Sequence, residues 1–344
     1  MTIQYSVVMP TFNRKEQLML TLASFENQTF PMDQFEVIVV DDGSTDGTDA
    51  EIRNYHPPYT LQYLSTGNWS GIPAAWNLGV KNATSPNIIF CDADFFVLPH
   101  FIETHHQYIV NHPDAVISSI PNCGRGIYLQ IFPEYAFEEK EWIANLLRQV
   151  GLWDDSYFSS NQVVKIVNED DVRDNLEKVL KAVCPVDYFP QVLREEYAKT
   201  DVAPWVLAIN RSLSVQKKYI ERAGWFDERL VRGGDWDMGY RLDKMGLPFI
   251  SVDKIVGYHQ EHPNLFRKQI TKTGESHLKI ILDKYGAEDP ELSLQTFFSP
   301  WDEGKQFKDM LRILHTLKQG TGFQKRLADS FINDLKKIAL EIVR

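Results

Sequence analysis

The chain has 344 residues, of which 43% are hydrophobic and 24% charged, so it is long enough for one large or two ordinary globular domains. Its formal net charge of -11 argues against general nucleic-acid binding, because phosphate contacts need clustered Lys and Arg. The three cysteines, Cys91, Cys123 and Cys184, fit neither a disulfide framework nor a zinc-binding spacing. Because no signal peptide or membrane-spanning apolar run is recognisable, we expect a cytoplasmic protein, with the inner face of the membrane as an alternative location.

The first 123 residues alternate between short apolar segments and amphipathic ones. We expect strands over residues 5–10, 35–40, 61–64 and 87–91, and helices over 15–27, 44–55 and 72–81. This alternation is typical of a mostly parallel, Rossmann-like α/β sheet flanked by helices. Ligands of such sheets bind outside the carboxyl ends of the strands, so a site is expected there.

The rest of the chain divides into three further segments. Residues 124–200 are acidic and rich in aromatic residues, with helices expected over 141–150 and 171–183, and suggest an inserted lid or acceptor-binding element. In residues 201–277 we expect a strand over 205–209 and a helix over 215–223, followed by GWFDERLVRGGDWDMGYRLDKMG. Residues 278–344 have apolar residues at helical spacing, which suits a packing helix, a homo-oligomer contact or a peripheral membrane contact.

Several polar side chains come just after the expected strands. Asp92 and Asp94 would repel each other unless a cation lies between them or one is protonated. Mg2+ and Mn2+ take oxygen ligands and share their coordination sphere with substrate phosphates. Against this, an isolated Asp-x-Asp is more often a solvated turn, and an Asp-Asp-Gly-Ser turn can simply cap the next helix. The residues that should meet at the sheet edge are Thr11, Phe12 and Asn13, then Asp41 and Asp42, and then Asp92 and Asp94.

Three groups downstream offer further candidates, each beside a structural alternative. Asp235 and Asp237 begin an expected helix, where they can cap it, or where one can act as general base toward an acceptor hydroxyl. His259 and His262 follow an apolar run and can complete a metal shell, contact a phosphate or stay solvated. The tryptophans that can either stack on sugar rings or pack in the core are Trp205, Trp225 and Trp236.

Taken in this order, the motifs resemble those of the family 2 glycosyltransferases of GT-A fold. The resemblance is carried by SVVMPTFNR, VIVVDDGSTDGT, GIPAAWNLGVKNA, FCDADFFVLP and AGWFDERL with GGDWDMGYRL, over most of residues 1–122 and about 203–262. It implies an inverting transfer of a sugar from a nucleotide-sugar, with a UDP-sugar favoured, to a hydroxyl of a sugar, lipid-linked or peptide acceptor. The implied cofactor is Mn2+ or Mg2+, and nucleic acid is not an expected partner.

The resemblance also implies roles on the donor side. Asp92 and Asp94 match the Asp-x-Asp motif, in which the second aspartate binds the metal and the first contacts the ribose or the metal-bound waters. We place His259 beside Asp94 as a second metal ligand. Asp42 would sit against the nucleotide base. The residues that would line the same nucleotide pocket are Pro10, Thr11 and Phe12.

On the acceptor side, Asp235 stands where the family carries its catalytic base. Gly234 replaces the glutamate that usually precedes this base, which leaves the class of acceptor open. We place Trp236 and Asp237 at the acceptor. The implied division is a nucleotide-sugar-binding half over 1–123, an inserted lid or acceptor region over 124–200, an acceptor-side half with the base over 201–277, and a helical extension over 278–344.

Three other functions share some of these sequence features. A phosphatase of the haloacid dehalogenase type also places Asp-x-Asp after a strand, but near its N-terminus and without the Phe95 and Phe96 that follow here. A nucleotidyltransferase would need a glycine-rich, basic loop near the first strand, which TFNRKEQ is not. A non-catalytic module that binds a nucleotide-sugar is disfavoured because the acidic residues of the expected site are all present.

Overall fold

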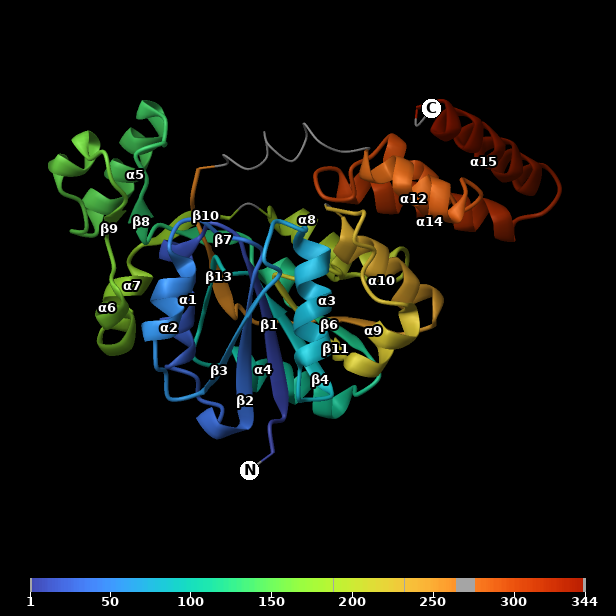
Figure 1. The fold of residues 1–344 in the computed structure, drawn as a ribbon. Helices are drawn as coiled ribbons and strands as arrows, with labels where there is room; N and C mark the ends of the chain where they lie inside the picture. The colour runs from blue at the N-terminus through green and yellow to red at the C-terminus, as the bar shows by residue number, and fades with distance from the viewer. Residues whose placement is uncertain (1, 188, 232, 264–275, 343–344) are drawn as a thin grey trace.

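A seven-stranded mixed sheet forms the centre of the computed structural model, which describes residues 2–187, 189–231, 233–263 and 276–342 (Figure 1). The strand order is β12-β6-β11-β4-β1-β2-β3. Only β11 runs antiparallel to its neighbours in this sheet, so the expected mostly parallel α/β sheet is confirmed. Its strands are β1 (Tyr5–Thr11), β2 (Phe35–Asp41), β3 (Thr60–Ser65), β4 (Asn87–Cys91), β6 (Val116–Ser118), β11 (Ser212–Gln216) and β12 (Phe249–Ser251).

Both faces of this sheet are buried, which explains why its central strands are apolar almost throughout. In β1, Val8 packs on the face covered by α3, while Val7 and Met9 pack on the opposite face with α1 and α4. This alternation follows the two-residue repeat of a strand. The covering helices are α1 (Lys15–Phe25), α3 (Ile72–Asn82) and α4 (Phe101–Asn111), and α2 (Thr48–Asn54) lies between β2 and β3 in the chain.

A second, four-stranded sheet carries part of the candidate site. Its order is β10-β7-β13-β5, and His259 of β13 pairs with Phe95 of β5. This register places His259 next to Asp94, although 165 positions separate them in the chain. The strands are β5 (Phe95–Val97), β7 (Arg125–Ile127), β10 (Val183–Asp187) and β13 (Gly257–Gln260).

The inserted segment forms a lobe with its own apolar core (Figure 1). This core reaches Leu20 and Ala23 of α1, so the lobe is packed onto the sheet domain. Asn27 donates a hydrogen bond to the carbonyl of Val172 over 2.6 Å, which fixes the two parts further. The elements of the lobe are α5 (Phe137–Gln149), η3 (Asp155–Ser159), α6 (Glu169–Asp174), α7 (Leu176–Leu180), and a two-stranded sheet of β8 (Gln130–Ile131) and β9 (Val164–Lys165).

Two elements differ from the sequence-based expectation. The strand expected over 205–209 is wrong, because this run begins with Pro204 and forms the 3-10 helix η4 (Pro204–Leu207), packed in the core. A short apolar run does not by itself distinguish a buried helix from a buried strand. The helix expected over 171–183 is interrupted at Asn175, whose side chain accepts a hydrogen bond from the backbone N–H of Lys178 and starts α7.

The C-terminal extension is helical, as expected, and shares the larger core with α10 (Figure 1). In the part of the chain that the structure describes, none of the helices combines the length and the apolar character needed to cross a bilayer. The remaining helices are α8 (Gln191–Ala198), α9 (Lys217–Ala223), α10 (Gly234–Lys244), α12 (His277–Tyr285), α13 (Pro290–Ser293), α14 (Gly304–Gln319) and α15 (Phe323–Ile342), with short 3-10 turns η1 (Met32–Gln34), η2 (Ile120–Asn122) and η5 (Leu294–Thr296).

Candidate active site

The loops that follow β1 and β2 are joined at the carboxyl edge of the sheet. The backbone N–H of Asn13 donates to Ser44 Oγ over 2.8 Å, and the N–H of Thr45 donates to Asn13 Oδ1 over 2.7 Å. The N–H of Asp42 donates to the carbonyl of Thr11 over 2.9 Å. The expected meeting of these two loops is therefore confirmed.

Asp42 holds a third loop against this edge. Its buried carboxylate accepts hydrogen bonds from the N–H groups of Ser70 and Gly71, each over 2.8 Å, and from Thr66 Oγ1 over 2.9 Å. Gly43 has a φ of +87°, and a Cβ there would lie 2.8 Å from the backbone nitrogen of Trp69. A side chain at position 43 would therefore push this loop away.

Asp94 lies among three cationic or potentially cationic side chains. The atoms nearest its Oδ2 are Arg14 Nη1 at 3.2 Å, His262 Nε2 at 3.3 Å and His259 Nε2 at 3.8 Å. Burial opposes ionisation of this carboxyl, but Arg14, His259 and His262 outweigh it and hold the pKa of Asp94 well below its usual range. The site therefore presents a carboxylate, not a carboxylic acid, to a ligand.

Asp94, His259 and His262 form a group that could hold a metal ion, since one ligand atom from each lies within 4.8 Å of the others. His259 Nδ1 lies 3.1 Å from Glu261 Oε1, and His262 Nδ1 lies 3.0 Å from the carbonyl of Pro263. With both Nδ1 atoms turned to these acceptors, the two Nε2 atoms face Asp94, which is the orientation that a metal-ligating histidine needs. The donor set, one carboxylate and two imidazoles in this orientation, fits a divalent metal.

Asp92 occupies a different environment from Asp94. Burial and the charge of Asp94 raise the pKa of Asp92 above its ordinary value, while Arg211 Nε lies 3.6 Å from its Oδ2. Arg211 precedes β11, and the pairing of Ser212 with Cys91 places it beside Asp92. Arg14 and Arg211 thus bring two positive charges to the pair of aspartates.

Asp235 lies in the first turn of α10, close enough to Asp92 for the charge of Asp92 to raise the pKa of Asp235. Burial raises the pKa of Asp235 from 3.8 to about 6, and the negative charge of Asp92 acts in the same direction. The hydrogen bond from the N–H of Trp236 lowers this pKa but is outweighed. Such a carboxyl is ionised at neutral pH and is a stronger base than an exposed aspartate. The geometry therefore suits a general base.

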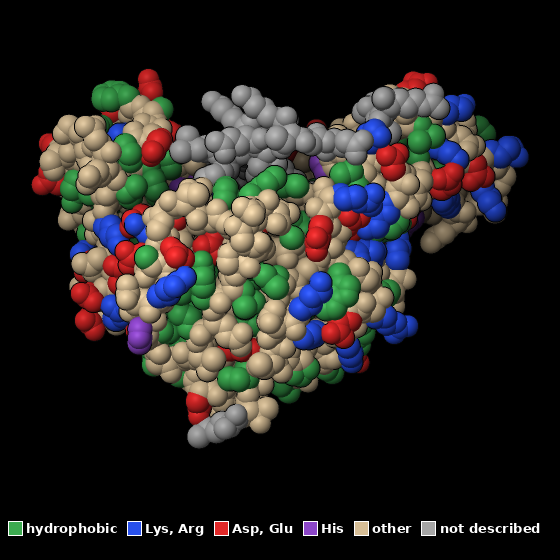
Figure 2. Space-filling model, viewed as in Figure 1, with side chains coloured by type: hydrophobic (Ala, Val, Ile, Leu, Met, Phe, Trp, Pro, Cys, Tyr) green, Lys and Arg blue, Asp and Glu red, His purple; other side chains and the backbone are tan. Residues whose placement is uncertain are grey.

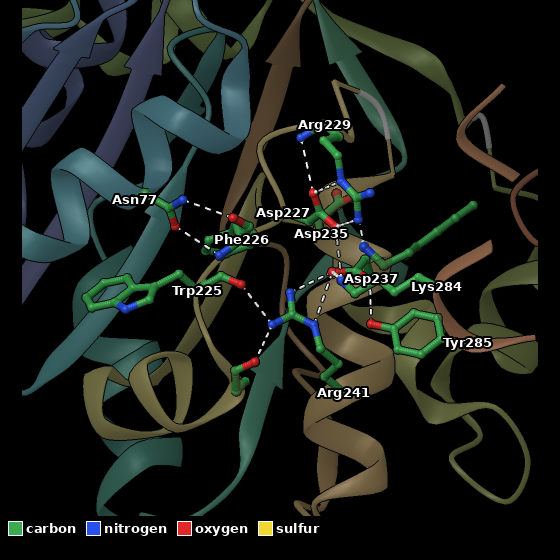
Figure 3. Close-up of polar contacts among 12 residues, drawn as sticks. Asn77, Trp225, Phe226, Asp227, Arg229, Asp235, Asp237, Arg241, Lys284 and Tyr285 are labelled. Atoms are coloured by element: carbon green, nitrogen blue, oxygen red, sulfur yellow. Dashed lines mark hydrogen bonds and ion pairs between the residues drawn. The ribbon is translucent and has the colours of Figure 1, made fainter. Parts of the chain in front are cut away.

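Asp237, two positions further on, is held in an ion-pair network (Figure 3). Its fully buried carboxylate accepts from Arg241 Nη2 over 2.6 Å, Lys284 Nζ over 2.8 Å and Tyr285 Oη over 2.6 Å. Trp236 remains partly exposed and donates through its Nε1 to the carbonyl of Val206 over 3.2 Å. These contacts favour a structural role for Asp237, whereas its expected contact with the acceptor stays a prediction.

The remaining candidates divide between the site and the core. Trp205 is core, because it is 1% exposed and donates through Nε1 to Glu291 Oε2 over 2.8 Å. Two buried polar atoms near the edge of the sheet, Thr11 Oγ1 and Asn210 Nδ2, have no hydrogen-bond partner among the described residues. Arg211 Nε makes no hydrogen bond among these residues either, but it is ion-paired with Asp92. Buried orphans of this kind need an explanation, and a polar ligand bound at this edge would provide one.

Sequence reasoning missed two residues of this cluster and left a third undecided. Arg14 lies inside the TFNR segment, and an arginine just past the first strand was a usable signal. Arg211 had no local signal, because its position depends on β11 pairing with β4. His262 was considered together with His259, and both lie next to Asp94.

Comparison with known proteins agrees with the resemblance found in the sequence. Residues 6–152 match the family described as Glycosyl transferase family 2. An uncharacterized glycosyltransferase of Bacillus subtilis, YfnE, is 28% identical over 91% of this chain and 79% of its own length. The chondroitin synthase of Escherichia coli is 27% identical over 75% of this chain, which spans 35% of that longer protein.

Solved structures show the same fold at low sequence identity. Residues 1–349 of TarS from Staphylococcus aureus, in complex with UDP-GlcNAc, superpose with a TM-score of 0.56 at 14% identity, covering 98% of this chain and 91% of that one. The complex of the same protein with UDP gives a TM-score of 0.53 at 16% identity, covering 87% and 74%. The sheet, the order of the motifs and this superposition all agree with a GT-A fold.

Proposed function

We propose that this chain is a family 2 glycosyltransferase of GT-A fold that transfers a sugar from a UDP-sugar to an acceptor hydroxyl with inversion of the anomeric centre. The observation that carries the proposal is the grouping of Asp94, His259 and His262 beside Asp92 and Asp235 at one edge of the sheet. The preference for UDP over other nucleotides is supported by TarS, which shares the fold and was solved with UDP and UDP-GlcNAc.

On the donor side, Asp42 and the end of β1 would bind the nucleotide. Asp42 Oδ2 accepts one hydrogen bond from the described residues, so this oxygen keeps the capacity to accept another from a base N–H. Thr11 Oγ1 is buried, has no hydrogen-bond partner in the part of the chain that the structure describes, and would bind a polar group of the nucleotide. Pro10 and Phe12, on either side of Thr11, would line the same pocket, and Asp92 would contact the ribose.

The diphosphate would lie against Asp94, with His259 and His262 as the other protein ligands of a divalent metal. A metal bound there would neutralise charge on the departing diphosphate. Two imidazoles in the donor set favour Mn2+ over Mg2+, since Mg2+ prefers oxygen ligands almost exclusively. Arg14 and Arg211 add positive charge that would stabilise the same leaving group.

Asp235 would take the proton of the acceptor hydroxyl. As the acceptor oxygen forms its bond to the anomeric carbon, the bond from that carbon to the phosphate oxygen breaks, and its electron pair leaves with UDP. Attack from the side opposite the leaving group inverts the anomeric configuration. The partly exposed Trp236 next to Asp235 would pack against the acceptor, and the lobe, which lies within residues 124–200, would bind a more distant part of it.

The proposal is tested with a panel of UDP- and GDP-sugars, each with Mn2+ or with Mg2+. We expect a UDP-sugar to raise the melting temperature and to be slowly hydrolysed only when a metal is present, more strongly with Mn2+. Asp94→Ala should abolish both effects. Release of phosphate from simple phosphate esters without any nucleotide would instead support the phosphatase alternative.

Glu261 is predicted to support the metal site by orienting His259. It lies 3.1 Å from His259 Nδ1, and a Cβ on Gly126 would lie 2.0 Å from Glu261 Oε1, so the carboxylate is closely confined. Glu261→Gln should lower Mn2+ affinity by roughly 10- to 100-fold, because partners that orient metal-ligating histidines contribute about that much. Isothermal titration of the protein with MnCl2 measures this effect.

The matched control for this prediction is Glu177→Gln, since the side chain of Glu177 is 87% exposed on α7 in the lobe. It should leave the Mn2+ affinity unchanged. An equal affinity for Mn2+ in the wild type and the Glu261 variant would show that Glu261 does not support the site.

A further inference from the structure

The inserted lobe carries a pocket that is separate from the candidate active site. One side of the pocket is a stripe along α5, in which Phe137, Glu141, Asn145 and Arg148 follow one another at spacings of four, four and three residues. Such spacing places side chains on one face of a helix. The other side is Phe158 of η3, and the pocket, which is open to solvent, has a volume of about 230 Å3.

Aromatic side chains form the wall of this pocket. The rings of Phe137 and Phe158 lie 5.9 Å apart at 33°, and Trp153 supports Phe158 from 5.1 Å at 69°. The guanidinium of Arg148 lies 5.9 Å from the rings of both Phe158 and Trp153. Asp155 pairs with Arg148 and accepts a hydrogen bond from Trp153 Nε1 over 3.1 Å, so the wall is fixed by polar contacts as well.

Phe137 presents much of its side chain to solvent. It is 63% exposed, and hydrophobic side chains reach the surface of this lobe (Figure 2). Beside it, Glu141 and Asn145 offer planar acceptor and donor groups at the rim. Exposed aromatic area next to a few placed polar groups is the composition of a ligand site.

The chemistry of the pocket fits one pyranose ring. The C–H face of a sugar packs on an aromatic ring, while carboxylate and amide side chains bind its hydroxyls. The pocket combines Glu141 with Arg148, and Arg148 is neutralised by Asp155, so it offers no net positive charge for a phosphate or a nucleotide. A volume of about 230 Å3 lies below the usual range for pockets that hold drug-sized ligands and suits a single sugar ring.

We infer that this pocket binds a sugar residue of the acceptor glycan at a distance from the reacting end. The inference rests on the proposed function, which makes a saccharide chain the acceptor. The lobe rises beyond the carboxyl edge of the sheet and is fixed to α1, where Arg173 pairs with Glu26 over 2.9 Å (Figure 1). A glycan held there would be anchored relative to Asp94 and Asp235, and longer acceptors would bind more tightly than short ones.

The test is binding of the full chain to an array of immobilised oligosaccharides, two to ten sugars long, that includes chondroitin and hyaluronan fragments. The wild type is expected to bind at least one glycan series with affinity that rises with length. Phe137→Ala and Asn145→Ala should each lower that affinity at least 10-fold. Phe323→Ala is the matched control, because Phe323 is 70% exposed on α15, away from the lobe.

Two results would overturn the inference: no binding of the wild type to any glycan on the array, or equal binding by the wild type and the Phe137 variant. UDP binding with Mn2+, measured on the same preparations, separates this inference from the proposed function. If UDP binds and the glycans do not, the pocket is not a sugar site. If UDP does not bind, the proposed donor site is wrong whatever the array shows.

Discussion

Asp235→Asn should lower the rate of sugar transfer by about 10^2- to 10^4-fold while leaving UDP binding intact, because the asparagine cannot accept the proton of the acceptor hydroxyl. The substitution keeps the shape of the side chain, so the acceptor-side turn of α10 is preserved. Initial rates of transfer and a calorimetric titration with UDP and Mn2+ measure the two quantities separately. For the wild type, kcat/KM should fall as the pH decreases through about 6, where Asp235 becomes protonated.

The same substitution should stabilise the fold at neutral pH. Burial raises the pKa of Asp235 from 3.8 to about 6, so the folded state pays to keep the carboxylate charged. Well below pH 3.8 the group is protonated in both folded and unfolded chains and contributes nothing. As the pH rises from 3.8 to about 6 the unfolded chain ionises first and stability falls, and above pH 6 the full cost, on the order of 1–3 kcal/mol, is present. The variant should therefore melt at a higher temperature at pH 8, with a difference that shrinks as the pH falls through about 6 and vanishes well below 3.8.

Asp243→Asn provides a matched control for both effects. Asp243 lies on the same helix, and burial together with Glu291 raises its pKa to about 6 as well. The contacts of Asp243 lie away from Asp92, so the Asp243 substitution should raise the stability without loss of sugar transfer. Near-normal turnover of the Asp235 variant would remove this residue as base, and equal loss of activity in both variants would point to a general disturbance of α10.

The first half of the fold was predictable because its signals are local. The strands β1, β2 and β3 are each followed by polar residues and a helix, and Thr11, Asp42 and Asp94 lie at or just past the carboxyl ends of β1, β2 and β4. In a parallel sheet, the position of a residue past its strand already fixes the edge on which it lies. The meeting of Asn13 with Ser44 and Thr45 needed no knowledge of distant pairing.

The rest of the site depends on contacts between segments far apart in the chain. Arg211 reaches Asp92 only because β11 runs antiparallel to β4, and the sequence had placed a strand over 205–209 instead. His259 reaches Asp94 through the pairing of β13 with β5, a register that no local pattern specifies. Such pairings are set by the tertiary fold, so the sequence could offer His259 as a metal ligand but not the strand register that brings it to Asp94.

Asp237→Ala should destabilise the protein by about 3–5 kcal/mol, because it removes the shared partner of two cations in a buried network. The side chain of Asp237 has no exposed area, and it joins Arg241 of α10 to Lys284 and Tyr285 of α12 (Figure 3). Without it, Arg241 and Lys284 would be left close together with less compensating charge. Urea unfolding, followed by circular dichroism at pH 7.5, gives the change in the free energy of unfolding.

The control is Asp283→Ala, which breaks an ion pair with Lys279 on the surface of α12, where the aspartate side chain is 62% exposed. Surface pairs contribute at most about 1 kcal/mol, so a clear difference between the two variants is expected. An Asp237 variant that unfolds no more easily than the Asp283 variant, but needs much more acceptor for half-maximal rate, would instead place Asp237 in contact with the acceptor. If the Asp237 variant is less stable but its folded fraction has an unchanged KM for the acceptor, Asp237 has a structural role. It then links α10 to α12 and so holds in place the turn that carries Asp235.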